Sequence, residues 1–185
     1  MSWLEVMIKN ISEALAKEMA KHSDPQLELL EEARKWLGIH EKKGSPSESV
    51  DVFRRAVDGV AGGESWCAAF VQYCCAAVAG RTKSHMSIPP SELCSYIWDK
   101  TPIKYRLEKP APGALIVWNY PGTIKGHIGI VEEIGEQGRI LWTIEGNTRA
   151  PGDGGSREGT GVYRKMRTHL SSQNMTLLGY LKPFK

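Results

Sequence analysis

The sequence lacks any apolar stretch long enough to cross a membrane as a helix. It also lacks a secretory signal, because charged side chains interrupt the N-terminal segment where an apolar core would be needed. The interrupting residues are Glu5, Lys9, Glu13, Lys17 and Glu18. We therefore expect synthesis in the cytoplasm without a signal peptide, so that any action outside the cell requires release or delivery.

Strong charge bias and metal-binding motifs are absent too. The 24 Lys and Arg against 21 Asp and Glu give a net charge of +3, and no basic run predicts a nucleic-acid partner. No Asp-rich calcium loop is present, and the four cysteines form no CxxC pair of the structural zinc type. We expect neither a metal nor another cofactor. The 185 residues, 41% of them hydrophobic, suit one monomeric globular domain with an appendage.

The appendage is an amphipathic helix predicted over residues 3–19. Its apolar side chains recur at helical spacing opposite a charged face. They are Trp3, Leu4, Met7, Ile8, Ile11, Leu15 and Met19. We favour a helix that packs on its own domain. The alternative is a targeting helix or a docking element for a protein partner, such as an adaptor or an immunity protein. We place this extension at residues 1–23 and the main domain at residues 24–185.

The main domain has its predicted helices first and its strands second. Helices are expected to begin at Asp24, Ser65 and Ser91, with a shorter one through Val50 and Phe53. Turn residues separate five β-type segments. These are Ala114–Trp118, His127–Ile134, Arg139–Glu145, Gly161–Met166 and Thr176–Leu181. This order predicts an α+β fold with an antiparallel sheet of about five or six strands.

Cys67 lies within the first turn of the predicted helix that Ser65 opens. Unsatisfied backbone N–H groups and the positive end of the helix dipole favour a thiolate at such a position. Thiol proteases present their nucleophile from the start of a buried helix, and the residues after Cys67 are small or apolar. The alternative is one more core cysteine. We expect Cys74, Cys75 and Cys94 to be buried small hydrophobic residues in a reducing compartment.

His127 begins a predicted strand and shares one face of it with Gly129 and Val131. A glycine two residues after the histidine leaves room for another element to approach closely. We expect the helix of Cys67 to pack there and bring its thiol within reach of the imidazole. The alternative is a surface histidine at a turn.

Thr143, Glu145 and Asn147 share a face of the next predicted strand. A turn around residues 135–138 would pair the two strands antiparallel. Glu145 or Asn147 could then accept a hydrogen bond from the second ring nitrogen of His127, which fixes the tautomer and stabilises imidazolium. The alternative is that these side chains shape the following turn, above all Asn147.

Four strings carry a resemblance to a known family. They are ESWCAAFV (64–71), PGALIVW (112–118), GHIGIV (126–131) and TIEGN (143–147). In this combination and order they resemble the CHAP amidases of the NlpC/P60 superfamily, which are papain-like cell-wall hydrolases. The similarity covers about residues 27 to 182. The resemblance implies a papain-like NlpC/P60 fold.

The resemblance also implies roles for particular residues. Cys67 matches the nucleophile, His127 the general base and Glu145 the polar residue that orients the histidine. Asn147 matches a frequent fourth member of the site. Two aromatic residues match positions that border the cleft, where they would contact substrate, although core packing is an equal alternative for both: Trp66 and Trp118.

The function implied is hydrolysis of an amide bond in peptidoglycan, in the stem peptide or the cross-bridge, by an amidase or an endopeptidase. No second, wall-binding module is evident, which leaves a phage endolysin, a delivered toxin and a phage-derived gene as sources. Such a protein would act on the cell wall after release or delivery. Two other interpretations stay open: a papain-like acyl or amide hydrolase with a non-wall substrate, and a catalytically relict wall-binding module.

Overall fold

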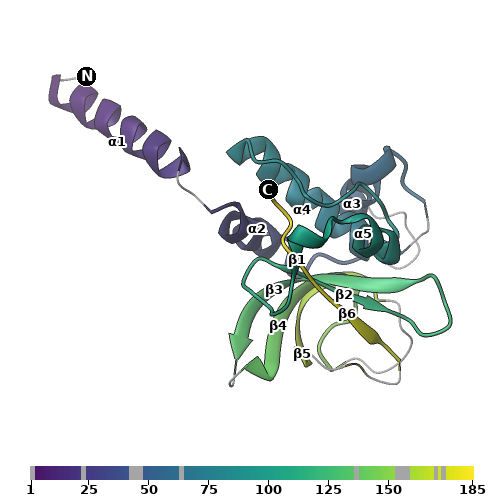
Figure 1. The fold of residues 1–185 in the computed structure, drawn as a ribbon. Helices are drawn as coiled ribbons and strands as arrows, with labels where there is room; N and C mark the ends of the chain where they lie inside the picture. Colours follow the sequence, from purple (N-terminus) through teal and green to yellow (C-terminus); the bar gives the residue numbers. More distant parts are fainter. Residues whose placement is uncertain are drawn as a thin grey trace.

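The fold, seen in a computed structural model, is α+β (Figure 1). The structure describes residues 3–21, 24–41, 48–62, 65–135, 138–152, 159–168, 171 and 174–185. The helices are α1 (Trp3–Lys21), α2 (Pro25–Arg34), α3 (Glu48–Asp58), α4 (Cys67–Thr82) and α5 (Cys94–Lys100), with a 3₁₀ turn, η1 (Ile103–Tyr105). The strands are β1 (Arg106–Leu107), β2 (Leu115–Asn119), β3 (Gly126–Gly135), β4 (Ile140–Thr148), β5 (Gly161–Thr168) and β6 (Thr176–Leu181).

The strands form a six-stranded sheet in the order β1-β6-β2-β3-β4-β5, with antiparallel neighbours throughout. This confirms the predicted α+β class and the antiparallel sheet. The turn expected between β3 and β4 includes residues 136 and 137, which lie outside the described residues. The two-residue strand β1 was not predicted, because so short a segment carries no alternation to detect.

Local signals at the helix starts are confirmed in α2. Asp24 Oδ1 accepts a hydrogen bond from the backbone N–H of Gln26 at 2.9 Å, and Pro25 occupies the first helical position. Helix α4 begins at Cys67, two residues after the predicted start, and has Trp66 as its N-cap. Lys83, in the left-handed conformation with φ of 59°, ends it.

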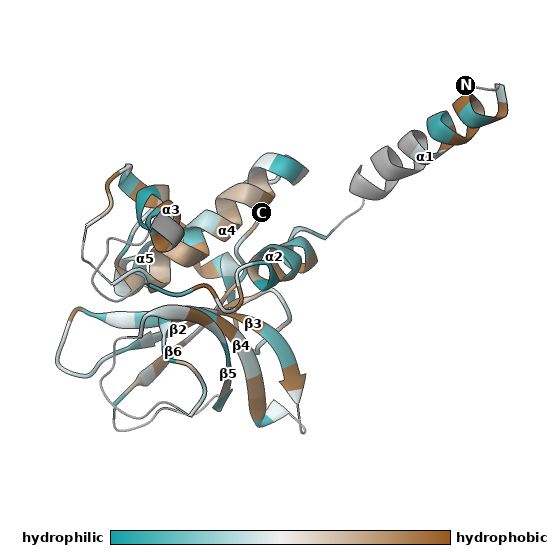
Figure 2. Ribbon diagram, turned by 180° about the vertical axis from the view of Figure 1, so that it is seen from behind, coloured by the Kyte–Doolittle hydropathy of each residue, from teal (hydrophilic) through white to brown (hydrophobic). Residues whose placement is uncertain are grey.

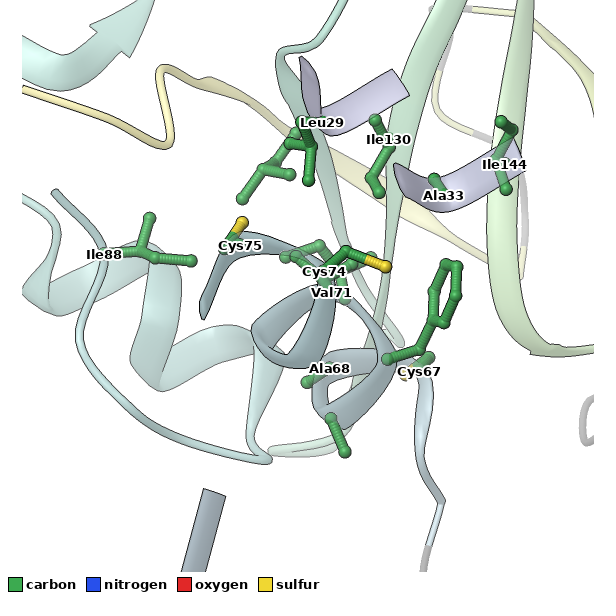
Figure 3. Close-up of a cluster of buried hydrophobic side chains, with 14 of the residues drawn as sticks. Leu29, Ala33, Cys67, Ala68, Val71, Cys74, Cys75, Ile88, Ile130 and Ile144 are labelled. Atoms are coloured by element: carbon green, nitrogen blue, oxygen red, sulfur yellow. The ribbon is translucent and has the colours of Figure 1, made fainter. Parts of the chain in front are cut away.

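The main core lies between the helices and one face of the sheet. Helix α4 packs between α2 and α3 and rests on β3 and β4. Figure 3 shows the cluster at close range. It includes Leu29 and Ala33 of α2, Val71, Cys74 and Cys75 of α4, Ile130 of β3 and Ile144 of β4. All of these side chains are buried. A smaller apolar cluster covers the opposite face of the sheet, since its members alternate with those that face the helices: Ile116, Trp118, Val131, Leu141 and Tyr180.

Helix α4 approaches the sheet closely at Gly146 of β4, and not at Gly129 of β3 as the sequence predicted. A methyl group on Gly146 would lie 2.6 Å from Phe70 Cβ and 2.9 Å from Trp66 Cζ3. The expectation that α4 packs over Gly129 is therefore wrong. At Gly129 an added methyl group would instead lie 2.7 Å from Glu145 Cγ, so the space is taken by a side chain of the neighbouring strand.

Helix α1 projects away from the rest of the chain (Figure 1). Residues 3–12 are all exposed, with Trp3 at 79% and Ile8 at 58%. Figure 2 shows hydrophobic and hydrophilic residues interspersed along this part of the helix. The expectation that its apolar face packs on its own domain is wrong for these residues. The periodicity reveals an apolar face and contains no information about what covers it. None of the helices among the described residues combines the length and the hydrophobicity that a membrane-spanning helix needs.

Candidate active site

The start of α4 places Cys67 at the centre of the candidate site. Cys67 is the first residue of the helix and is buried. The residue before it is held by two contacts: Trp66 Nε1 donates to Glu41 Oε1 at 2.6 Å, and its ring stacks on Phe53 with centroids 5.6 Å apart. Trp66 has no exposed surface. Its position therefore corresponds to the core-packing alternative. As the N-cap of α4, the fixed Trp66 also holds the following residue, Cys67, in place.

His127 lies on β3 directly opposite Trp118 of β2. The two rings stack with centroids 5.9 Å apart and an interplanar angle of 26°. One ring nitrogen of His127, Nε2, lies 2.8 Å from Glu145 Oε2. This contact leaves Nδ1 as the ring nitrogen available to Cys67, whose thiol is near enough to the imidazole for each group to shift the pKa of the other. Trp118 is buried, and its ring packs against one face of the imidazole.

Glu145 is fully buried and held on both oxygens. Thr143 Oγ1 donates to Oε1 at 2.6 Å. Arg167 of β5 donates from Nε to Oε1 at 2.8 Å and from Nη2 to Oε2 at 2.5 Å. A bidentate guanidinium and a hydroxyl satisfy a buried carboxylate that would otherwise be costly to desolvate. The carboxylate is therefore fixed where it meets His127.

The negative charge of Glu145 and the positive charges of His127 and Arg167 stabilise each other. Burial raises the pKa of Glu145, but the hydrogen bonds from Arg167 and the charge of His127 outweigh it and hold that pKa well below its usual range. Burial lowers the pKa of His127, but the Glu145 charge, followed by the hydrogen bond and charge of Cys67, raises it to about 9. The imidazole is thus protonated at neutral pH while its carboxylate partner is ionised.

The four cysteines of the domain differ in the direction in which their surroundings shift the thiol pKa. A hydrogen bond from Cys94, and then one from His127, hold the pKa of Cys67 well below its usual range despite burial. Burial is the main cause that raises the pKa of both Cys74 and Cys75. The Sγ atoms of Cys67 and Cys94 lie 3.7 Å apart, and this hydrogen bond, followed by burial, raises the pKa of Cys94. Cys67 is the thiol that the surroundings keep ionised.

Asn147 contributes to the backbone. It is buried and has φ of 52°, the left-handed region that asparagine tolerates better than most residues. It lies where the register between β4 and β5 shifts, between Glu145 and Thr148. This is the structural alternative considered for Asn147, and the hydrogen bond to His127 comes from Glu145. Participation of Asn147 in catalysis stays a prediction.

Two residues of the site were not predicted from the sequence. Cys94 is buried, as expected, but its contact with Cys67 joins residues 27 positions apart, and no pattern indicates it. Arg167 reaches Glu145 across the β4–β5 pair. Its position two residues after Lys165 indicates a shared strand face but not which neighbour that face meets. In the described residues, no three His, Cys, Asp or Glu side chains are grouped so that they could hold a metal ion.

Comparison with known proteins gives one match. A protein-family model described as the CHAP domain matches residues 59–147, a stretch that contains Cys67, His127 and Glu145. No curated protein and no solved structure matches the chain.

Proposed function

Because a CHAP domain occupies residues 59–147 of this chain, we propose that the protein is a cysteine-dependent peptidoglycan hydrolase with Cys67 as its nucleophile. The CHAP family implies hydrolysis by a cysteine and a peptidoglycan substrate. The observation that carries the assignment to these residues is the placement of His127 between the Cys67 thiol and the buried Glu145 carboxylate. A nucleophile, a base and a group that orients the base are the elements of nucleophilic acyl transfer.

The proposed reaction begins with the Cys67 thiolate. Its sulfur attacks the carbonyl carbon of an amide and forms a tetrahedral oxyanion. Backbone N–H groups in the first turn of α4 have no partner within the helix and can donate to that oxyanion. His127 then gives its proton to the leaving amine, the C–N bond breaks, and a thioester remains on Cys67.

Water completes the cycle. His127, now neutral, accepts a proton from a water molecule that attacks the thioester carbonyl. The C–S bond breaks, a carboxylic acid leaves, and the thiolate–imidazolium pair is restored. Glu145 stays ionised throughout, because Arg167 and Thr143 hold its two oxygens, and it orients the imidazole in both half-reactions.

The proposed bond is an amide in the stem peptide or in the cross-bridge, and the action takes place on the wall after release or delivery. Digestion of purified sacculi with the wild type, Cys67→Ala and Cys75→Ala tests this. Both variants remove a buried thiol from α4, but only the first removes the one whose pKa His127 lowers. Mass spectrometry of soluble fragments should show release by the wild type and Cys75→Ala alone. A new free N-terminal stem alanine identifies an amidase, and a broken stem or bridge identifies an endopeptidase.

The same digestion can also contradict the wall as substrate. If sacculi of several chemotypes release nothing while Cys67 still reacts with iodoacetamide, the wall is not the substrate. The thiol hydrolase would then act on another acyl or amide group.

We further propose that residues 1–23 form an extension that catalysis does not require, with residues 24–185 as the hydrolase domain. The exposure of residues 3–12 and the projection of α1 in Figure 1 support this division. Deletion of residues 1–22 should leave the melting temperature and the hydrolysis rate unchanged. A protein that no longer folds after this deletion would contradict the division.

A further inference from the structure

A hollow of about 190 Å³ lies beside the candidate active site, and His127 forms part of its wall. Three cationic side chains line it as well: Arg149, Lys165 and Arg167. No Asp or Glu among the described residues lines it. Among the described residues, Glu145 contacts two members of this lining: it is fully buried and already bonded to His127 and Arg167.

The sheet brings these cations together from separate parts of the chain. Lys165 and Arg167 are two residues apart on β5 and so share a face. Arg149 directly follows β4, the strand paired with β5. Lys165 Nζ donates to the backbone oxygen of Arg149 at 3.0 Å, which ties the end of β4 to the rim of the hollow. The cationic lining is therefore built by strand pairing, and all three side chains are only partly exposed.

The lining has donors for a ligand. A guanidinium has five N–H groups, and Arg167 directs two of its nitrogens at Glu145. Among the described residues that line or contact the hollow, the single carboxylate is that of Glu145, and it faces two cations, Arg167 and the His127 imidazolium. Partly desolvated cations around a small hollow attract an anionic group more strongly than exposed ones do.

We propose that this hollow is a subsite for a carboxylate group of the substrate, beside the bond that is cut. The inference rests on the proposed function, because it supposes that the substrate is a peptide. It adds that the peptide is acidic and that Arg149, Lys165 and Arg167 recognise a carboxylate on it. A hollow of this size holds a carboxyl group and a few further atoms, so the selection concerns one side chain or terminus of the peptide.

Binding to the Cys67→Ala protein tests the subsite without turnover. Two synthetic stem peptides that differ only in one group, a carboxylate or the corresponding carboxamide, are titrated by calorimetry. The carboxylate peptide should bind about tenfold more tightly, the value of one charge-assisted hydrogen bond. Lys165→Gln and Arg149→Gln in the same background should remove this preference. Lys104→Gln is the matched control, since it deletes an exposed cation outside the hollow.

The results separate the subsite from the proposed function. Equal binding of the two peptides, or binding of neither, overturns the subsite even when the wild type digests sacculi. A carboxylate preference that depends on Lys165 and Arg149, in a protein whose wild type cuts no peptide, leaves the subsite and overturns the hydrolase. Displacement of the carboxylate peptide by inorganic phosphate at far lower concentration than by acetate would reassign the hollow to a phosphoryl group. Unchanged melting temperatures show that the variants are folded.

Discussion

The Sγ atoms of Cys67 and Cys94 lie 3.7 Å apart, and both side chains are buried. Each residue is the first of its helix, so α4 and α5 bring two thiols to one point. The two differ in ionisation: the pKa of Cys67 is held low and that of Cys94 is raised. Cys94 is therefore the S–H donor of the pair, and Cys67 is the thiolate acceptor.

The first prediction concerns this donor. Cys94→Ala should raise the pKa of Cys67, because its largest stabilising contact is lost. Cys94→Ser should restore most of the effect, since a hydroxyl donates to a thiolate at a similar position. The measurement is the rate of Cys67 alkylation by iodoacetamide across pH, with peptide mapping to identify the labelled residue. The same pH profile in the wild type and Cys94→Ala would show that Cys94 only fills space.

The second prediction concerns oxidation. Hydrogen peroxide should transfer an oxygen atom to the Cys67 thiolate, which with one proton from solvent gives a sulfenic acid and water. The Cys94 thiol then attacks that sulfur and releases a second water, so that both thiols are oxidised to a disulfide. The sulfur atoms need to close from 3.7 Å to about 2.05 Å.

The oxidised wild type should be lighter by two hydrogen atoms, inactive, and restored by dithiothreitol. Cys94→Ser should lose activity without this recovery, because the sulfenic acid has no resolving thiol and proceeds to sulfinic acid. Irreversible loss in both proteins, with no disulfide in the wild-type peptide map, would contradict the prediction.

The third prediction concerns pH. Protonated His127 supplies the proton to the leaving amine, so the hydrolysis rate should fall as pH rises through about 9, where His127 loses that proton. At the acidic end the rate should hold well below the pH at which an ordinary thiol protonates, because the pKa of Cys67 is lowered.

Glu145→Gln removes the charge that raises the pKa of His127, so the alkaline limb should move to lower pH. The maximal rate should fall roughly 10²-fold or more, the usual contribution of a positioned proton carrier, with some activity left. An unmoved limb at full rate would transfer the orienting role to another residue, with Asn147 next to be tested.

The fourth prediction concerns Gly146. Gly146→Ala places a methyl group against Phe70 and Trp66 and should push the first turn of α4 away from β4. We expect a loss of about 1–3 kcal/mol in the free energy of unfolding and slower alkylation of Cys67. Gly135→Ala is the matched control, since its added methyl group would have no neighbour closer than 3.8 Å. Equal effects of the two substitutions would show that close approach at Gly146 does not position the thiol.

Local patterns in the sequence predicted much of this architecture. Asp24-Pro25 predicted the start of α2, alternation predicted the strands, and the motif around residues 64–71 placed Cys67 in the first turn of a helix. Contacts between segments that are distant in the sequence could not be predicted from such local patterns. The sequence contains several glycines in strands, and only the packed structure shows that α4 lies over Gly146 and that Glu145 fills the space at Gly129.

The same limit applies to the partners of the site. Cys94 and Arg167 meet Cys67 and Glu145 through the relative placement of helices and strands, which no local period encodes. The aromatic residues show a related difficulty. Trp66 directly precedes Cys67 and Trp118 ends another motif string, but Trp66 is buried in the core and Trp118 stacks on the ring of His127.

The most direct test of the central claim is to trap the acyl-enzyme. The wild type is mixed with a stem peptide, quenched in acid within the first turnovers, and its peptides are mapped by mass spectrometry beside those of Cys67→Ala. The account predicts an adduct on Cys67 that has the mass of the acyl fragment and that hydroxylamine removes. Cleavage of the peptide with no adduct on Cys67, or cleavage by Cys67→Ala at the wild-type rate, would contradict it.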